Sequence, residues 1–202
     1  MAEKDLLKKY REKRDFDLSA EPFGGDKNQK DADKKIFVIQ KHEATNLHYD
    51  FRLLIAGVLK SWAIPKGPST NPKVKRLAIR TEDHPLEYAD FEGVIPKNQY
   101  GGGTVMVWDS GTYSTDKKDE NNKPISMQKQ LENGHCTFVL NGHKLKGGYV
   151  LLRMKNQEKN EQWLLKKIED KEADARRKPT KTENKSVLTG RTMKEIEKEE
   201  KS

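Results

Sequence analysis

Apolar and polar residues alternate along several short stretches of this chain, a pattern typical of β-strands that are buried on one face. The clearest alternation runs from His48 to Leu53, where apolar side chains face one way and polar side chains the other. In a helix, residues two apart diverge by about 200°, so the polar groups would scatter around the axis. We therefore predict a strand whose polar face carries His48, Asp50 and Arg52.

Comparable stretches recur along the chain. We expect strands at 36–42, 58–64 and 76–82, on both sides of an Asp-Ser-Gly turn at 109–111, in a hairpin over 136–154, and at 161–168. Short helices are expected at 5–13, before Asn133-Gly134, and at 192–201. Eight or nine short strands without a βαβ rhythm predict a mainly β fold. We expect a small antiparallel β-barrel of about eight strands with short peripheral helices, and an antiparallel sandwich is the alternative.

Composition divides the chain into three parts. Residues 36–168 contain the expected strands, whereas 1–35 and 169–202 each hold ten basic and nine acidic residues. We expect 1–35 to form a helix and an arm, and 169–202 to form a charged, flexible tail. Three apolar residues, Phe16, Leu18 and Phe23, predict that about 11–25 is anchored, while 26–34 forms a loose loop.

The charge of the chain is concentrated in its middle part. The net charge is +8, and residues 36–168 hold 20 basic against 14 acidic groups. Such an excess on a compact domain favours a polyanionic partner such as nucleic acid, although a basic protein without such a role shows the same balance.

Cysteine usage and hydropathy exclude several classes of protein. Cys136 is the single cysteine, so neither an intramolecular disulfide nor a cysteine-based zinc site is available. No apolar run approaches the length that spans a membrane, and the N-terminus lacks the apolar core of a signal peptide. We expect a cytoplasmic protein.

The polar face of the two first strands carries the most distinctive chemistry. The connector 43–47 is short enough for a hairpin, which would bring His42 close to His48 and Asp50. Two imidazoles and a carboxylate without a thiolate suit manganese, iron or zinc. Arg52 supplies a planar fork that matches a phosphate group. On spacing alone, polar residues at a strand edge that serve solubility remain the alternative.

Two further motifs have a local interpretation. The run Gly101–Gly103 precedes a strand and no helix follows it, so we expect a tight bend or bulge there, not a phosphate-binding loop. His84 and Tyr88 are four residues apart, so one helical turn after Pro85 would set their side chains side by side.

Two rival functions use other residues. An iron and 2-oxoglutarate oxygenase would draw on His48, Asp50, His143 and Arg153, but it leaves His42 unexplained. A non-catalytic nucleic-acid-binding module would use the basic surface together with stacking by Trp62 or Trp108.

Several motifs, in order, resemble one known family. They are QKHEATNLHYDFRL, LKSWAIPKGPS, RLAIRTEDHPLEYADFEGVIP and YGGGTVMVWDSGTY. Together they are similar to the 3′-phosphoesterase domain of bacterial DNA ligase D, over roughly residues 8 to 168. The closing SVLTGRTMKEI also resembles the segment that follows this domain in the full ligase. The sequence shows no ligase or polymerase domain, so we expect a free-standing version of the 3′-phosphoesterase domain.

The resemblance implies a role for each matching residue. The metal ligands would be His42, His48 and Asp50, and manganese is the usual metal, with Co²⁺ or Zn²⁺ as alternatives. The implied phosphate-contacting residues are Arg52, Lys66, Arg76, His84 and Tyr88. Gln40 and Glu82 match positions beside the ligands or facing the substrate. The residues by which the N-terminal arm completes the site would be Arg14, Asp15 and Glu21.

The implied activity is repair of DNA 3′ ends during double-strand break joining. Enzymes of this family remove a 3′-terminal ribonucleoside to leave a 3′-phosphate, and remove a 3′-phosphate to expose a hydroxyl. His84 is the expected group for proton transfer or phosphate contact, because the ordinary pKa of histidine lies near neutrality. The resemblance further implies DNA ends as substrate and a ligase or Ku-like protein as partner. We expect a monomer.

Overall fold

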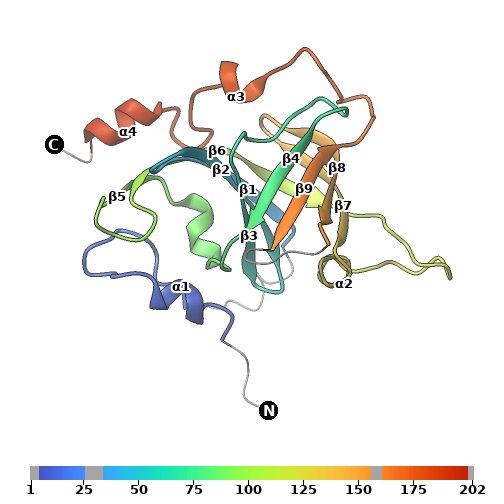
Figure 1. The fold of residues 1–202 in the computed structure, drawn as a ribbon, viewed down its shortest axis with the longest axis horizontal. Coiled ribbons are helices and arrows are strands. Elements are labelled where there is room, and N and C mark those ends of the chain that lie inside the picture. The colour runs from blue at the N-terminus through green and yellow to red at the C-terminus, as the bar shows by residue number, and fades with distance from the viewer. Residues whose placement is uncertain (1–4, 26–33, 156–160, 200–202) are drawn as a thin grey trace.

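In the parts of the chain that the structure describes, nine antiparallel strands form one sheet, and eight of them close into a barrel. The computed structural model describes residues 5–25, 34–155 and 161–199. The sheet order is β1-β2-β3-β4-β9-β8-β7-β6-β5, and an additional pairing of β1 with β6 closes the ring, which leaves β5 outside it (Figure 1). The strands are β1 (Ile36–Glu43), β2 (Leu47–Ile55), β3 (Val58–Ile64), β4 (Lys75–Arg80), β5 (Gly93–Ile95), β6 (Gly103–Ser114), β7 (His135–Gly142), β8 (Lys146–Arg153) and β9 (Gln162–Lys167). The expected barrel of about eight strands is confirmed.

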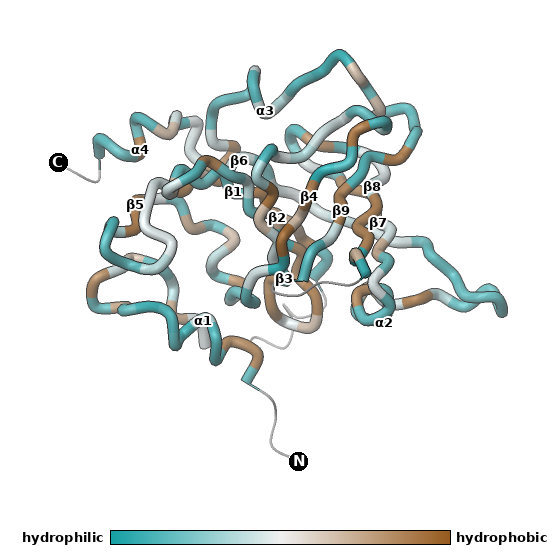
Figure 2. The backbone as a smooth tube through the Cα atoms, in the orientation of Figure 1, coloured by the Kyte–Doolittle hydropathy of each residue, from teal (hydrophilic) through white to brown (hydrophobic). Residues whose placement is uncertain are grey.

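The barrel interior is filled with large apolar side chains. The alternation seen in the sequence sends one face of every strand inward, because side chains in a strand point to opposite faces in turn. Phe51 stacks on Phe138 at 5.7 Å between ring centroids, and Trp62 meets Trp163 edge to face at 5.8 Å. The tube in Figure 2 is accordingly most hydrophobic along the strands. The barrel therefore has a packed apolar core.

Strand β6 differs from the expected pair of strands around an Asp-Ser-Gly turn. It continues through Asp109 to Gly111, pairing first with β1 and then with β7, with one register shift against β1. The buried Asp109 carboxylate accepts hydrogen bonds from the backbone N–H groups of Lys144 and Leu145, and so ties β6 to the connection after β7. The prediction of a turn was wrong because these turn-forming residues serve a long-range contact.

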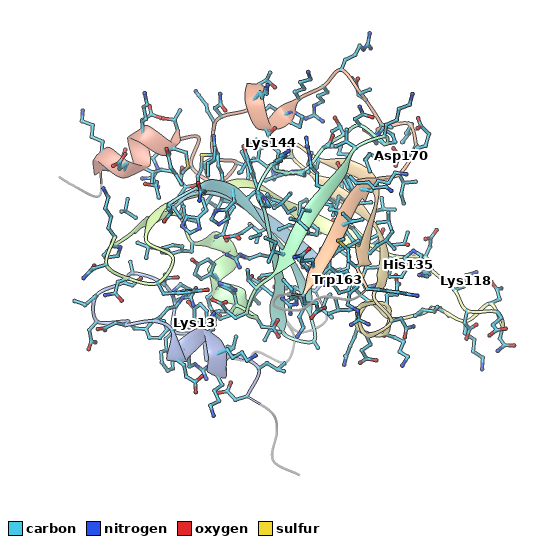
Figure 3. All side chains as sticks on the ribbon, viewed as in Figure 1. Lys13, Lys118, His135, Lys144, Trp163 and Asp170 are labelled. Atoms are coloured by element: carbon cyan, nitrogen blue, oxygen red, sulfur yellow. The ribbon has the colours of Figure 1, made fainter. Side chains whose placement is uncertain are left out.

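Short helices and connections cover the barrel. They are α1 (Lys8–Glu12), the 3₁₀ helix η1 (Leu86–Asp90), α2 (Met127–Glu132), α3 (Pro179–Thr182) and α4 (Met193–Glu199). Met127 of α2 joins the main apolar core, and Figure 3 shows the neighbouring loop around Lys118 extending away from the barrel. The helical turn expected after Pro85 is present as the 3₁₀ helix η1, and the rings of His84 and Tyr88 lie side by side with centroids 4.8 Å apart.

The outer face of β1, β2 and β3 is covered by η1 and by the N-terminal arm, residues 5–25. The fully buried Tyr10 of α1 anchors this arm, and its hydroxyl donates to the carbonyl of Pro22 at 2.6 Å. Phe16 is partly buried against the same cluster, but Leu18 and Phe23 are 55% and 58% exposed. Two of the three expected anchors are therefore wrong, and the main anchor is Tyr10. The loop expected at 26–34 lies mostly outside the described residues.

The segment 169–199 is packed along the barrel and does not extend as the flexible tail that its composition predicted. The indole N–H of Trp108 donates to the carbonyl of Glu183 at 2.7 Å, and the Tyr49 hydroxyl donates to the carbonyl of Thr180. Further along, Ile196 of α4 is fully buried in the main core. A few apolar residues and backbone carbonyls thus hold a segment that is charged almost throughout.

Candidate metal centre

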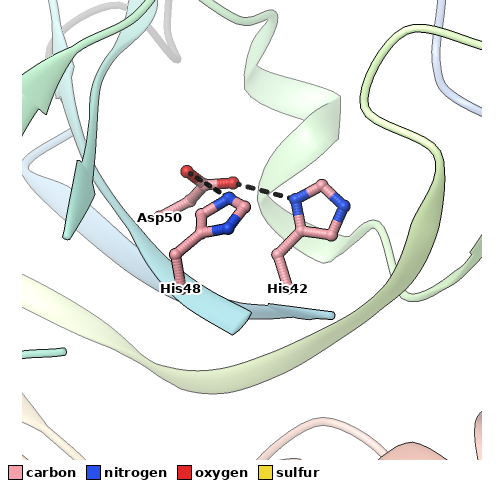
Figure 4. A group of neighbouring side chains, drawn as sticks. All are labelled: His42, His48 and Asp50. Carbon is pink, nitrogen blue, oxygen red and sulfur yellow. Dashed lines mark ion pairs between the residues drawn. The ribbon is translucent and has the colours of Figure 1, made fainter. Parts of the chain in front are cut away.

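The two histidines and the aspartate from the first hairpin converge on one point outside the barrel wall. His42 and His48 are directly opposite each other in the β1–β2 register, and Asp50 follows on the same face of β2. One nitrogen of each imidazole and one carboxylate oxygen of Asp50 lie within 4.8 Å of one another. Figure 4 shows both rings turned toward the carboxylate. Because histidine nitrogen and carboxylate oxygen are common ligands of divalent transition metals, this set fits such an ion.

Backbone carbonyls fix which nitrogen each imidazole offers to the cluster. Nε2 of His42 lies 2.8 Å from the carbonyl oxygen of Gly101, and Nδ1 of His48 lies 2.8 Å from that of Asn46. A carbonyl oxygen can only accept a hydrogen bond, so these two nitrogens are the ones that carry the N–H. The lone pairs are left on Nδ1 of His42 and Nε2 of His48, which lie 3.6 and 3.7 Å from Asp50 oxygens. Both lone pairs therefore face the position between the three residues.

The bend at the glycine run supplies one of these carbonyls. Gly101 has φ of +77°, a conformation that glycine adopts without cost, and it lies in the turn closed by Gly102 N–H and the Gln99 carbonyl. A Cβ on Gly103 would lie 2.2 Å from the carbonyl oxygen of Glu43, so only glycine fits where the loop meets β1. The expected tight bend is present, and it orients His42.

Arg52 braces the cluster from within the wall. Its guanidinium donates to Asp50 Oδ2 at 3.1 Å, to the Ser61 hydroxyl at 2.9 Å and to Gln40 Oε1 at 2.7 Å. Gln40 is fully buried and donates in turn to the carbonyls of Tyr88 and Phe91 in the η1 region. Gln40 thus holds Arg52 in place and links the wall to η1.

Positive charge keeps Asp50 ionised despite its burial. Burial alone would raise the pKa of this carboxyl group, but the positive charge of the Arg52 guanidinium beside it outweighs the burial, so its pKa lies well below the ordinary value. An ionised carboxylate is the form that binds a metal ion.

The N-terminal arm contributes Arg14, which contacts two carboxylates and one imidazole on the far side of the cavity. Arg14 donates from Nε to Glu21 at 2.8 Å and from Nη1 to Glu82 at 3.1 Å. Its Nη2 lies 3.2 Å from Nε2 of His84. The Tyr88 hydroxyl also donates to Glu21, at 3.0 Å. The arm, the β4–η1 connection and η1 are therefore tied together by one hydrogen-bonded network.

His84 is neutral in this network. Because Arg14 is a donor, Nε2 of His84 accepts, and the proton is on Nδ1, which donates to the carbonyl of Glu82 at 2.9 Å. Burial, with the nearby charges of Arg52 and Arg14, lowers the pKa of His84 well below its ordinary value. The ordinary pKa on which a proton-transfer role was expected does not hold in this environment.

One open cavity of about 270 Å³ brings these groups together. Its walls include the three ligand residues together with Arg14, Arg52, Glu82, His84 and Tyr88.

Five of the expected residues do not line this cavity. Gln40 and Glu21 are buried behind the cavity residues that they bond. Asp15 is exposed and accepts the Asp17 N–H, and Lys66 is exposed after β3. Arg76 lies two residues before Ala78 on β4 and therefore on the same, inward face of this strand. It is paired with Leu165, a residue of the core.

Sequence reasoning missed four contributors. Ser61 and Tyr10 contact Arg52 and Arg14, the Gly101 carbonyl orients His42, and Tyr100 lines the cavity. Of these four, only Ser61 could have been found from the sequence. It is a polar residue within the largely apolar run 58–64, and its partner Arg52 lies on the neighbouring strand.

The two rival sets are not assembled. Nδ1 of His143 contacts the carbonyl of Ser110, and Arg153 bonds the carbonyl of Glu132. Neither is part of the cluster at Asp50, so the oxygenase reading is wrong for the described residues. Trp62 and Trp108 are fully buried and are not available to stack on DNA bases.

An antiparallel barrel that carries a His-His-Asp centre on its outer wall, between Arg52 of the wall and Arg14 of the arm, defines a protein with a candidate metal site for an anionic ligand. Comparison with known proteins gives the particular family: the model of the DNA ligase D 3′-phosphoesterase domain matches residues 40–153, and the chain belongs to this family.

Curated relatives cover most of the chain. It is 46% identical over 191 residues to the "Multifunctional non-homologous end joining protein LigD" of Pseudomonas aeruginosa. The aligned region covers 93% of this chain and 22% of the relative. It is 42% identical over 166 residues to the corresponding LigD of Mycobacterium tuberculosis, covering 82% of this chain and 20% of the relative. The chain thus spans about a fifth of the length of these relatives. Among the helices in the described ranges, none is long and apolar enough to cross a membrane.

Proposed function

We propose that this protein is a metal-dependent phosphoesterase that processes DNA 3′ ends in double-strand break repair by end joining. It removes a 3′-terminal ribonucleoside by phosphodiester hydrolysis and a 3′-phosphate by monoester hydrolysis. The observation that carries this proposal is the single cavity in which the His42, His48 and Asp50 cluster meets Arg14 and Arg52. Membership of the 3′-phosphoesterase family supports the same conclusion.

The cavity residues have distinct parts in this proposal. A divalent ion, Mn²⁺ by preference and Co²⁺ or Zn²⁺ as alternatives, would be held by the three ligands and would act as a Lewis acid on the phosphate ester. Arg52 uses three of its five N–H donors on Gln40, Ser61 and Asp50, and the others can donate to a phosphate oxygen. Such fixed donors stabilise the negative charge that develops on the non-bridging oxygens.

On the opposite wall, His84 acts as a hydrogen-bond acceptor that positions Arg14. Glu82 and Glu21 hold the same guanidinium from two further directions, and Tyr88 fixes Glu21. In this assignment Lys66 approaches the DNA from outside the cavity, Asp15 belongs to the arm that completes the site, and Arg76 supports the barrel wall. The DNA 3′ end is the substrate, the active unit is a monomer, and a ligase or Ku-like protein is the partner in repair.

The test is hydrolysis of DNA primers that end in a ribonucleotide or a 3′-phosphate, with and without Mn²⁺, and with 2-oxoglutarate turnover followed in parallel. We expect His42→Ala, His48→Ala and Asp50→Ala each to abolish Mn²⁺ binding by calorimetry and product formation. His143→Ala, at an exposed histidine outside the cluster, is the matched control. Lost activity in His143→Ala with retention in His42→Ala would sink the proposal.

A further inference from the structure

Tyr100 is an exposed aromatic residue at the mouth of the cavity whose position is fixed by the site itself. Its side chain lines the cavity, yet the residue is 47% exposed. It lies in the turn beside Gly101, the residue whose carbonyl orients His42. The ring is therefore held at a defined place relative to the metal ligands.

Two cationic residues of the arm hold Tyr100, one of them through its hydroxyl and both through cation–π contacts with its ring. Lys13 Nζ donates to the Tyr100 hydroxyl at 3.1 Å and also to Glu82 at 3.0 Å. The same nitrogen lies 4.5 Å from the ring centroid, and the Arg14 guanidinium lies 5.5 Å from it. Figure 3 shows Lys13 on the arm that covers this side of the wall. An aromatic ring beside two cations suits a ligand that is both flat and negatively charged.

The cavity is too small to hold a whole nucleotide. Its volume of about 270 Å³ lies at the small end of sites that enclose a small molecule, which span roughly 300–1,000 Å³. With a phosphate among Arg14, Arg52 and the ligand cluster, the attached sugar and base must extend toward the mouth. The exposed aromatic side chain found there among the described residues is Tyr100.

We propose that Tyr100 is a substrate-binding residue that stacks on the base of the 3′-terminal nucleoside. This inference rests on the proposed function, because it places the scissile phosphate at the ligand cluster. Stacking on an aromatic side chain is tolerant of base identity, since every base has a π-face. Tyr100 therefore selects for the presence of a terminal nucleoside without reading its sequence.

The experiment is a two-by-two comparison of protein and substrate. Wild type and Tyr100→Leu act on primers whose terminal ribonucleotide carries a base or lacks it. Removal of one stacked base typically costs a factor of roughly five to 100 in affinity. We expect Tyr100→Leu to raise KM by about tenfold on the base-bearing primer with little change in kcat. Wild type should show a similar rise on the abasic primer, and combining the two changes should add little. Tyr100→Phe, which keeps the ring, should restore the wild-type KM.

A binding measurement separates this inference from the proposed reaction. Primers that end in 2-aminopurine are titrated with protein, because stacking quenches the fluorescence of this base whether or not hydrolysis occurs. We expect quenching by wild type and by Tyr100→Phe, but not by Tyr100→Leu. Phe23→Leu is the matched control, since Phe23 is an exposed aromatic residue 4.7 Å from the Arg11 guanidinium and away from the cavity. Additive effects of residue and base, or bound DNA without quenching, would overturn the inference. Quenching without hydrolysis would overturn the proposed function instead.

Discussion

At the scale of single residues, the site is defined by hydrogen bonds that leave each group one remaining direction in which to act. Carbonyl groups of Gly101 and Asn46 occupy one nitrogen of each imidazole, so the other nitrogen faces Asp50. Arg52 is likewise held by three neighbours. Groups fixed in this way lose little conformational entropy when a ligand binds.

The bracing of Arg52 makes a conservative replacement severe. Lysine keeps the positive charge but offers one ammonium group, which cannot bond Gln40, Ser61 and Asp50 from one plane. We expect Arg52→Lys to reduce kcat/KM for 3′-end hydrolysis by at least about 100-fold. Arg153→Lys, an exposed arginine on β8, is the control and should change the rate by less than about twofold. A mild effect of Arg52→Lys would mean that charge alone matters at this position.

The buried neutral His84 makes stability dependent on pH. Because the folded-state pKa of His84 is lowered below 6.5, only the unfolded chain takes up a proton as the pH falls through that value. The free energy of unfolding should therefore decrease on acidification from about pH 7, by up to ~1.4 kcal/mol per pH unit. Denaturant unfolding between pH 7.5 and 5.5 measures this slope. The slope should become shallower in His84→Gln but not in His143→Gln. Identical slopes in the wild type and in both variants would contradict the assignment of a buried, neutral His84.

At the scale of elements, a turn and an arm complete what the strands begin. The hairpin of β1 and β2 presents the candidate metal ligands, but the turn at 99–102 orients His42 and the arm supplies Arg14. Both the turn and the arm contact the outer face of the barrel from parts of the chain that are distant in sequence from β1 and β2. Local alternation of residues predicts the hairpin, and it carries no information about such crossings.

Two glycines allow the role of the turn to be tested. Gly101 and Gly190 have φ of +77° and +74°, and neither would place a Cβ within 3.8 Å of another atom. Alanine at either position should cost about 1 kcal/mol of folding free energy through backbone strain. We expect only Gly101→Ala to weaken Mn²⁺ binding as well, by roughly tenfold, because it displaces the carbonyl that fixes His42. Calorimetric titration of both variants checks this, and equal metal affinities would show that the carbonyl is dispensable.

Deletion of residues 1–25 tests the arm. Within the described part of this segment, residues 5–25, no side chain belongs to the main barrel core, so the shortened protein should fold and bind Mn²⁺. Its end-processing rate should fall by at least about 100-fold, because Arg14 and the groups that hold it are lost together. Circular dichroism and metal titration establish folding, and primer hydrolysis gives the rate. Unimpaired hydrolysis would show that the arm is only a covering segment.

At the scale of the whole molecule, the sequence predicts the barrel and the ligand cluster well and the outer segments poorly. The alternation from His48 to Leu53 locates a strand and its polar face directly, and the short connector brings His42 to the same place. Composition misjudged the segment after 168, because a few residues such as Ile196 hold it and the intervening charges give no hint of them. The positions of Arg76 and Gln40 could not be predicted for a similar reason. Whether such a residue lines the cavity depends on which face of the closed barrel is covered by other segments, and the local sequence does not show this.

The use of the outer wall has a consequence for how this protein can change over evolutionary time. Along β1 and β2, one set of alternate residues builds the core and the other set builds the site. Substitutions can therefore alter chemistry and folding separately. An insertion or deletion of one residue within either strand would exchange the two sets, turning the ligands inward and the aromatic residues outward. Length variation should accordingly be confined to the connections, such as 115–126, while these two strands keep a fixed length.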